Sequence, residues 1–279
     1  MTDICKFMEK SLMMLTGFFV LASDTSPVSA QKVSDDYVLV FSDEFNQPDG
    51  SRPDPAKWSC PPRLHATWSR WIADSRDVAF IKGGALVCRA IPNRGLPGDT
   101  ARMLTGAVFT KGKFEFRYGK VEVRMRTNRT VGNFPAAWLR TWDTGRQAWH
   151  SEIDIVEMFG NKRESAHTAH SQLTVSNVRH GQRNVFTHKL NTTRWHVYGV
   201  EWTENSILWT VDGEKVGEYV KSADERLLAQ GQWSFDFPLF LVLNQSVGDG
   251  GGYAHFVPQT GKTYETRFDW VRVYQKKTP

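Results

Sequence analysis

The sequence predicts an all-β protein, an antiparallel β-jelly-roll sandwich of two curved sheets, and three observations support this fold class. Apolar and polar residues alternate with a period of two in many short segments, as they do in strands with one buried face. Stretches rich in Pro, Gly, Asp and Arg, such as residues 46–62 and 91–101, interrupt these segments and are typical of loops. A single clear helix signal and the lack of any repeat of solenoid length favour a sandwich or jelly roll.

Alternating segments predict the strands in order along the chain. They cover residues 78–90, 105–110, 114–118, 121–126, 134–142, 195–202, 207–211, 214–220, 239–247 and 268–274. Gly119 marks the expected turn of one hairpin, and Asp212-Gly213 marks that of another, because Asp-Gly is a preferred sequence for a tight turn between strands.

The helix signal lies late in the chain and is short. Ser222 to Glu225 matches a capping box, in which Ser222 would cap the first turn. Leu227 and Leu228 provide an apolar side, and Gly231 suits the carboxyl end of the helix. We therefore expect one short helix here.

The first 30 residues predict a secretion signal. Two lysines precede an apolar run at residues 11–22, which is too short to span a bilayer comfortably, and Val28-Ser29-Ala30 resembles a cleavage site. Residues 31–279 are expected to form one β-jelly-roll domain, because no linker divides them and their number suits one large all-β domain. The protein is thus expected to be secreted (to the periplasm, the cell surface or the medium), to lack a membrane span and to be a monomer.

Charge and cysteine content narrow the function classes modestly. Residues 1–30 carry two Lys, two Asp and one Glu, so their removal raises the formal charge from +5 to +6, which fits an anionic partner. The basic residues are scattered along the chain, which argues against a nucleic-acid-binding stripe. Cys60 and Cys88 are the cysteines that remain. They could form a disulfide in an exported protein, and two buried thiols are an equal alternative.

The most informative segment carries three acids, Glu152, Asp154 and Glu157, inside an apolar run. On a regular strand Glu157 would face away from the other two. One extra residue in a bulge at Ile155-Val156 would place all three acids on one face. Because such crowding costs free energy through desolvation and repulsion, it indicates an active site, whereas the alternative is a strand whose acids simply face water. Two carboxyl groups about 5–5.5 Å apart are typical of a retaining glycosidase.

With these residues in view, the chain resembles glycoside hydrolase family 16, whose members are endo-acting β-jelly-roll enzymes with a cleft on the concave face. The bulged acidic motif is similar to the catalytic signature of that family. Six flanking segments are similar to family landmarks: Ser42–Phe45, Lys111–Phe114, Tyr118–Glu122, Phe134–Trp138, Tyr198–Trp202 and Asp269–Tyr274. The resemblance implies Glu152 as the nucleophile, Asp154 as its helper and Glu157 as the acid/base.

Physical chemistry supports this division of roles. The charge of Glu152 should raise the pKa of Glu157, so that Glu157 can donate a proton, and esterification of Glu152 should then let Glu157 act as a base. Asp154 can orient Glu152 by sharing a proton or a hydrogen bond. His170 matches a family position beside the acid/base, where it would tune or orient that residue, and a purely structural role is an equal alternative.

Tryptophans and arginines are candidates for substrate binding. The chain has 11 Trp, and the flat faces of sugars stack on aromatic rings. Trp138, Arg140 and Trp142 would share one face of a predicted strand, and Trp149 directly precedes the acids.

The loop at residues 60–71 adds further candidates of both kinds. Trp68, Arg70 and Trp71, together with Arg63, could form a mixed pocket with rings for sugars and guanidinium groups for sulfate or carboxylate. The alternative is a surface loop whose arginines stack on tryptophans.

The basic charge and this loop favour a red-algal galactan, porphyran or agarose, as the polysaccharide substrate, and the pattern resembles the porphyranase and agarase branch of the family. The laminarinase branch more often has Trp-Pro where this chain has Phe134-Pro135, and Gly where it has Ser151. An endo-β-1,3-glucanase is the second hypothesis, and a non-catalytic sugar-binding jelly roll is the third.

No cofactor is required for this chemistry, but the resemblance suggests a structural calcium on the convex face. The matching positions are Glu44, Gly84 and Asp269. Carboxylate and carbonyl oxygens are suitable calcium ligands.

Overall fold

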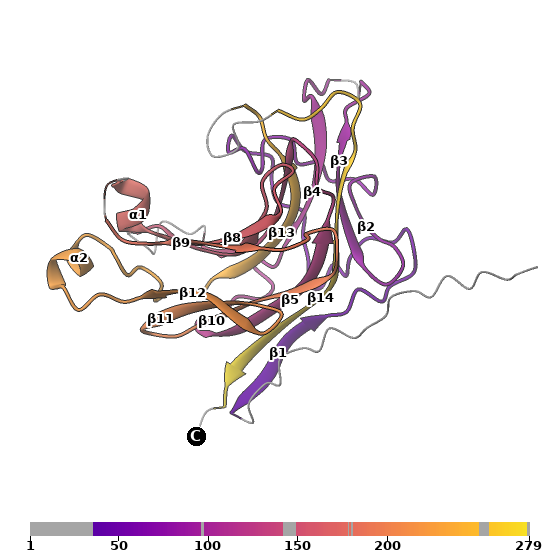
Figure 1. The fold of residues 1–279 in the computed structure, drawn as a ribbon. Helices are drawn as coiled ribbons and strands as arrows, with labels where there is room; N and C mark the ends of the chain where they lie inside the picture. The colour runs from indigo at the N-terminus through magenta and orange to yellow at the C-terminus, as the bar shows by residue number, and fades with distance from the viewer. Residues whose placement is uncertain are drawn as a thin grey trace, which may run out of the picture.

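The computed structural model describes residues 36–95, 98–141, 149–177, 179, 181–250 and 257–277, and this part of the chain forms fourteen strands and two short helices (Figure 1). The strands are β1 (Tyr37–Asp43), β2 (Ala79–Ile81), β3 (Leu86–Pro92), β4 (Met103–Phe109), β5 (Gly119–Thr127), β6 (Asn133–Arg140), β7 (Ser151–Glu157), β8 (Glu164–Ser171), β9 (Val185–Lys189), β10 (His196–Trp202), β11 (Ser206–Val211), β12 (Glu214–Val220), β13 (Phe240–Val247) and β14 (Tyr264–Lys276). The helices are α1 (Gln172–Ser176) and α2 (Glu225–Ala229). The predicted secretion signal lies outside the described residues.

The strands form one continuous antiparallel sheet that is folded into two layers. Its order is β12-β11-β10-β5-β14-β3-β4-β13-β6-β7-β8-β9, with β1 added beside β14 and β2 beside β3. Strands β12 to β3 form one layer and β4 to β9 the other, and the β3–β4 pair joins them at one side, as Figure 1 shows. The predicted all-β antiparallel jelly roll is confirmed, although the two expected sheets are halves of a single one.

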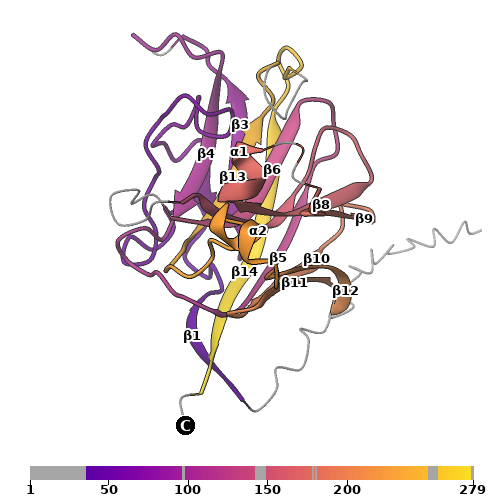
Figure 2. The same ribbon diagram turned by 90° about the vertical axis from the view of Figure 1, so that its left-hand side faces the viewer.

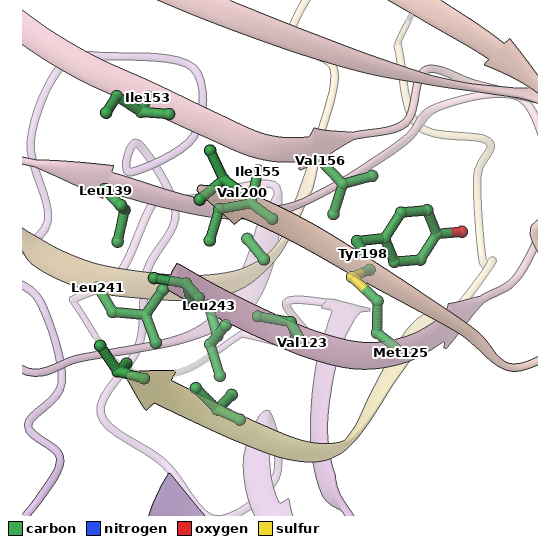
Figure 3. Packing of buried hydrophobic residues seen from close by; sticks show 14 of the residues in the cluster. Val123, Met125, Leu139, Ile153, Ile155, Val156, Tyr198, Val200, Leu241 and Leu243 are labelled. Atoms are coloured by element: carbon green, nitrogen blue, oxygen red, sulfur yellow. The ribbon is translucent and has the colours of Figure 1, made fainter. Parts of the chain in front are cut away.

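The hydrophobic core lies between the two layers. Ile153, Ile155 and Val156 of β7 are 0% exposed and belong to one buried cluster with Val123 of β5 and Val200 of β10. Figure 3 shows Ile155 beside Val200. Burial of each such side chain stabilises the fold by about 1.5–3 kcal/mol relative to an exposed position. Because alternate residues of a strand face opposite sides, the remaining positions of these strands face outward and are available for function.

Two of the predicted strands differ from the observed ones. Residues 78–90 form not one strand but the β2–β3 hairpin, whose turn contains Gly83 and Gly84 at φ +60° and +66°. Residues 114–118 form no strand, so the expected hairpin around Gly119 is wrong. Gly119 instead begins β5, where a Cβ atom would lie 2.2 Å from the carbonyl oxygen of Tyr274. The glycine therefore permits a close approach of two strands and does not make a turn.

The hairpin turn at Asp212-Gly213 is confirmed, since it joins β11 to β12 with φ of +50° and +86°. The predicted helix is also present as α2. Its N-cap, however, is Asp224, whose side chain accepts a hydrogen bond from the Arg226 amide, and not Ser222. No helix in the described ranges combines the length and apolar content needed to cross a bilayer.

Helix α1 was not predicted, and it lies at the same end of the sandwich as α2 (Figures 1 and 2). The Leu173 amide of α1 donates to the carbonyl of Gly231, just beyond α2. Ser171 caps α1 in a capping box with Thr174.

The two cysteines of the described chain are free. Cys60 is half-buried and Cys88 is fully buried. Burial raises the pKa of the Cys60 thiol to about 11.

Candidate active site

Strand β7 carries the three acids between β6 and β8, and it contains the expected bulge. Asp154 pairs with Thr168 of β8 and Glu157 with Ala166, so three steps along β7 match two along β8. The same shift occurs against β6. Ile153, Ile155 and Val156 enter the core, whereas Glu152, Asp154 and Glu157 line one groove. The prediction that a bulge brings all three acids to one face is confirmed.

The groove has a volume of about 480 Å³ and lies on the outer face of the β6, β7 and β8 layer. Strand β6 contributes its even-numbered residues because Ala137 and Leu139 face the core. Besides the acids, the main lining side chains are Trp68, Phe134, Trp138, Arg140, His150, Phe159, His170 and Asn244. Aromatic walls around a few charged groups are typical of a carbohydrate site.

Glu152 lies close to one arginine and two histidines. Its Oε2 atom lies 3.6 Å from Arg140 Nη1 and 3.6 Å from His150 Nε2, and its Oε1 atom lies 4.0 Å from His170 Nε2. Burial opposes ionisation, but the hydrogen bond from His150 and the charges of His170 and Arg140 outweigh it and hold the pKa of Glu152 below its usual value. Glu152 is therefore the acid of the three that ionises most readily.

Asp154 and Glu157 are shifted in the opposite direction. Burial, followed by the charges of Asp154 and Glu152, raises the pKa of Glu157 well above its ordinary value. Protonated Glu157 donates a hydrogen bond to Asp154, which also favours the proton. Burial raises the pKa of Asp154 as well, while the hydrogen bond from His170 opposes that rise. Because the three groups titrate together, they form one unit with its most acidic member at Glu152 and its most basic at Glu157.

His170 lies at a different place in the row than expected. Its position on β8 is opposite Glu152, and its Nε2 atom is 3.1 Å from Asp154 Oδ2. The expectation that it sits beside Glu157 is therefore wrong, because Glu157 pairs with Ala166 instead. Burial disfavours its charge, but Asp154 and Glu152 outweigh burial and raise the pKa of His170 to about 9.

His150 is a groove residue that was missed from the sequence. It precedes Glu152 by two positions, so the period-two rule would have placed it on the same face. Its peptide N–H is held by the side-chain oxygen of Gln172 in α1, at 3.0 Å.

Two buried side chains hold the backbone of the bulge from the core side. The Nδ1–H of His167 donates to the carbonyl of Ile155 at 2.6 Å, and the hydroxyl of Ser165 donates to Nε2 of the same ring at 2.9 Å. The Nε1–H of Trp209 donates to the carbonyl of Asp154 at 2.8 Å. A bulge interrupts the ladder, and buried carbonyls that lose partners must be satisfied elsewhere. These side chains therefore fix the backbone on which Glu157 stands.

The predicted tryptophan platforms separate into groove and non-groove residues. Trp138 forms part of the groove floor, where its Nε1–H donates to Asn244 and its ring packs edge-on against Trp68 at 4.9 Å. Trp71 is only 9% exposed and packs in a separate buried cluster with Met103 and Tyr264, so the structure does not place it as a platform.

Of the two remaining tryptophan candidates, Trp149 is not among the groove-lining residues. Trp149 is 38% exposed, and its Cδ2 atom would lie 3.3 Å from a Cβ atom added at Gly231. Trp142 lies outside the described residues.

The arginines of the loop at residues 60–71 are engaged with acids and do not form the expected sulfate fork. Arg63 forms a two-pronged ion pair with Asp99 at 2.8 and 2.9 Å. Arg70 pairs with Asp249 at 3.3 Å and is not among the groove-lining residues. Of the predicted arginines, Arg140 is the one that the structure places in the groove.

The carboxylates of the predicted calcium site are likewise paired with arginines. Glu44 binds Arg272 through both oxygens at 2.9 Å, and Asp269 contacts Arg124 at 2.5 Å. Gly84 lies next to the Asn46 side chain. These partners neutralise both carboxylates, so the donor set does not favour a cation there.

Among the described residues, one group of His, Cys, Asp and Glu side chains could share a metal ion, and it consists of Glu152, Asp154 and His170, with ligand atoms within 4.8 Å. A metal needs the lone pair of a neutral imidazole. Because the neighbouring acids raise the pKa of His170 to about 9, this ring is a protonated hydrogen-bond donor at neutral pH. The group is thus better suited to moving protons than to holding a metal.

Comparison with known proteins supports a carbohydrate-active site. Residues 92–239 match the family described as glycosyl hydrolases family 16. The chain is 32% identical over 243 residues to a keratan-sulfate endo-1,4-beta-galactosidase from Sphingobacterium multivorum, covering 86% of this chain and 56% of that protein. It is 30% identical over 281 aligned positions to a beta-glucanase from Rhodothermus marinus, covering 95% of this chain and 92% of that protein.

Solved structures resemble the fold as a whole. The chain superposes on SCLam, a non-specific endo-beta-1,3(4)-glucanase, with a TM-score of 0.75 and 26% sequence identity. The match covers 89% of this chain and 95% of that one. The match in architecture therefore extends over nearly all of the described chain.

Proposed function

Since the chain belongs to glycosyl hydrolase family 16, we propose that it is an endo-acting β-glycanase that cleaves a β-linked galactan and retains the anomeric configuration. The observation that carries the proposal is the placement of Glu152, Asp154 and Glu157 in one groove by the bulge of β7, where their surroundings lower the pKa of Glu152 and raise that of Glu157. A nucleophile must be ionised and a general acid must be protonated at the same pH.

The proposed reaction has two steps. Glu152 attacks the anomeric carbon, the glycosidic C–O bond breaks, and Glu157 gives its proton to the leaving oxygen. With Glu152 esterified, its charge is gone and the pKa of Glu157 falls, so Glu157 can take a proton from the water that cleaves the ester. Between the two steps, Asp154 and protonated His170 keep Glu152 in position.

A galactan is favoured by two features of the chain. The keratan-sulfate relative named above acts on a galactose-containing polymer, and this chain departs from the laminarinase pattern at Phe134-Pro135 and Ser151. Within galactans we propose porphyran or agarose, as the sequence pattern suggests. An endo-β-1,3-glucanase is the second candidate, and it is favoured by the structural similarity to SCLam. Export, which the leader-like residues 1–30 support, is part of the proposal.

A substrate panel tests the proposal directly. We expect new reducing ends from porphyran or agarose, with keratan sulfate and κ-carrageenan as further galactans and laminarin as the glucan. NMR of the first products should show the β-configuration retained. Activity on laminarin alone would refute the galactan substrate, and α-configured first products would refute the two-step route.

The pH profile of kcat/KM should be bell-shaped and wide. Activity should fall on the acid side as Glu152 gains a proton and on the alkaline side as Glu157 loses one, so the limbs lie below and above the ordinary carboxyl pKa of about 4.3. His150→Leu removes a group that lowers the pKa of Glu152. The acid limb should therefore move to higher pH in this variant, with the alkaline limb little changed. An acid limb that stays in place would contradict the assignment.

A further inference from the structure

The outer face of the other layer carries a row of four arginines, Arg89 on β3, Arg267 on β14, and Arg124 and Arg126 on β5, here called the arginine row. Arg126 lies directly opposite Arg267 in the register of β5 and β14. Neighbouring residues on β5 and β14 enter the core, so the row faces away from the core and from the catalytic groove. The two sites therefore lie on opposite outer faces of the sandwich.

The arginine row has more positive than negative charge. Glu265 lies between Arg89 and Arg267, at 2.8 and 2.7 Å, and one carboxylate is thus shared by two guanidinium groups. Asp269 pairs with Arg124, as described above. Arg126 makes no ion pair within the described residues. Four cations therefore face two anions.

Aromatic rings support the row at both ends. The guanidinium carbon of Arg89 lies 4.7 Å from the centre of the Phe80 ring. At the other end, Arg124 and Arg126 lie 5.1 and 4.8 Å from the half-buried ring of Trp195. A stacked guanidinium keeps its N–H groups at the edge, where they can donate to an oxyanion in the bidentate way.

The protein itself does not satisfy all the hydrogen-bond donors and charges of the arginine row. The Nε atom of Arg124 is buried and has no hydrogen-bond partner among the described residues. Burial and the charge of Arg267 lower the pKa of Arg126, which means that its positive charge is held at a cost. An external anion would relieve both conditions.

We propose that the arginine row with Trp195 and Phe80 is a second, non-catalytic binding site for an anionic polysaccharide chain. The charge excess selects a sulfated or carboxylated chain, and the rings offer flat surfaces for sugar faces. The row crosses several strands that are about 4.8 Å apart, and so it presents an extended track and not a pocket. A polysaccharide chain bound there would be held close to the enzyme, and its effective concentration at the groove on the opposite face would rise.

The proposal rests on the proposed polysaccharide substrate but not on the catalytic roles, so it is tested by binding. The Glu157→Gln protein is run in native gels that contain either κ-carrageenan or agarose, which are galactans with and without sulfate. We expect strong retardation by κ-carrageenan, and Arg126→Ala added to this protein should weaken the apparent affinity roughly tenfold, the loss of one charged hydrogen bond. Retardation in κ-carrageenan should fall with added salt.

Matched controls separate this site from general charge and from the groove. Arg226→Ala removes the same charge from α2, where the side chain is 87% exposed, and should leave retardation unchanged. Trp195→Ala should weaken binding as Arg126→Ala does, and Arg126→Gln provides a variant of similar size should the alanine variant not fold. Hydrolysis of a short neutral oligosaccharide by the otherwise native enzyme should be unaffected by Arg126→Ala.

Three results would overturn the second site. The first is retardation that is unchanged by both Arg126→Ala and Trp195→Ala. The second is a loss of retardation with Arg226→Ala as large as that with Arg126→Ala. The third is equal competition for binding by double-stranded DNA, which would indicate a general polyanion surface. If the enzyme proved inactive on the whole panel while the retardation behaved as expected, the proposed function would fail and the second site would stand.

Discussion

Replacing Glu152 by serine should reduce hydrolysis by about four orders of magnitude or more and leave polysaccharide binding largely intact. Loss of a nucleophile removes the covalent route itself, and such losses in enzymes reach about 10⁶-fold. Binding should persist because serine is smaller than glutamate and the aromatic walls of the groove are unchanged. Reducing-end assays measure the first effect, and retardation in polysaccharide gels measures the second.

Glu157→Gln should behave differently, and this difference tests the division of roles. Glutamine cannot donate the proton, so hydrolysis of polysaccharide should be lost. A synthetic aryl glycoside, whose leaving group needs little protonation, should still release its aryl group in the first step. Glu152→Ser should not release it. Glu164→Gln alters a carboxylate of β8 outside the groove and serves as the matched control. Undiminished hydrolysis by Glu152→Ser would refute the assigned nucleophile.

The fold was predictable wherever strands are half-buried and rich in large apolar residues. Val121, Val123 and Met125 alternate with polar residues, and this segment is indeed a strand with those side chains in the core. Strand β8 was not predicted because it consists mainly of Ser, Ala, Thr and His, which give no apolar period. It lies beside the bulge, where Ala169 is fully buried and His167 serves the backbone of β7. The small and polar residues of β8 are therefore explained by its contacts with β7. The sequence of β8 alone does not predict a strand.

The site shows the same division between local and distant information. The acids were found because strand parity is a local rule, and one bulge corrects it. The arginines were misplaced because their partners are far away in sequence, with Arg63 bound to Asp99 and Arg70 to Asp249. Charge balance depends on such long-range pairs. The composition therefore indicated a basic excess but not which of the cations are paired with acids in the fold.

Removing the ring that supports the bulge should impair turnover more than binding. His167→Leu leaves the buried carbonyl of Ile155 without its donor, at a cost of about 1–3 kcal/mol in the free energy of unfolding. Because Glu157 stands two residues further along the bulge, a shift of its carboxyl by about 1 Å could lower kcat roughly 100-fold. KM should change little, since Trp68 and Trp138 are not touched. The alkaline limb of the pH profile, which reports Glu157, should move as well.

A purely structural role for His167 would predict the stability loss without the kinetic one, and two variants separate these cases. Asparagine can place an N–H close to where Nδ1–H lies in histidine, so His167→Asn should recover much of the lost kcat. His196→Leu removes another hydrogen-bonded ring, which is half-buried on β10, is paired with Asp212 at 2.6 Å and makes no hydrogen bond to β7 among the described residues. It should lower the melting temperature but leave kcat and the alkaline limb unchanged. Equal kinetic losses in His167→Leu and His196→Leu would contradict a positioning role.

The stability of the protein at acid pH tests independently whether the His167 ring is held neutral in the folded state. Burial lowers the pKa of His167 to about 4, whereas the unfolded chain should titrate near 6.5. Between these values the unfolded state binds more protons than the folded one, so stability is lost as the pH falls from about 6.5 to 4. The full effect is about 3 kcal/mol, from 1.36 kcal/mol for each pKa unit. Denaturant unfolding at a series of pH values should show a shallower decline for His167→Asn than for the native protein. An identical decline would mean that the ring is not held neutral between the bulge and Ser165, and Glu157 would then owe its position to other contacts.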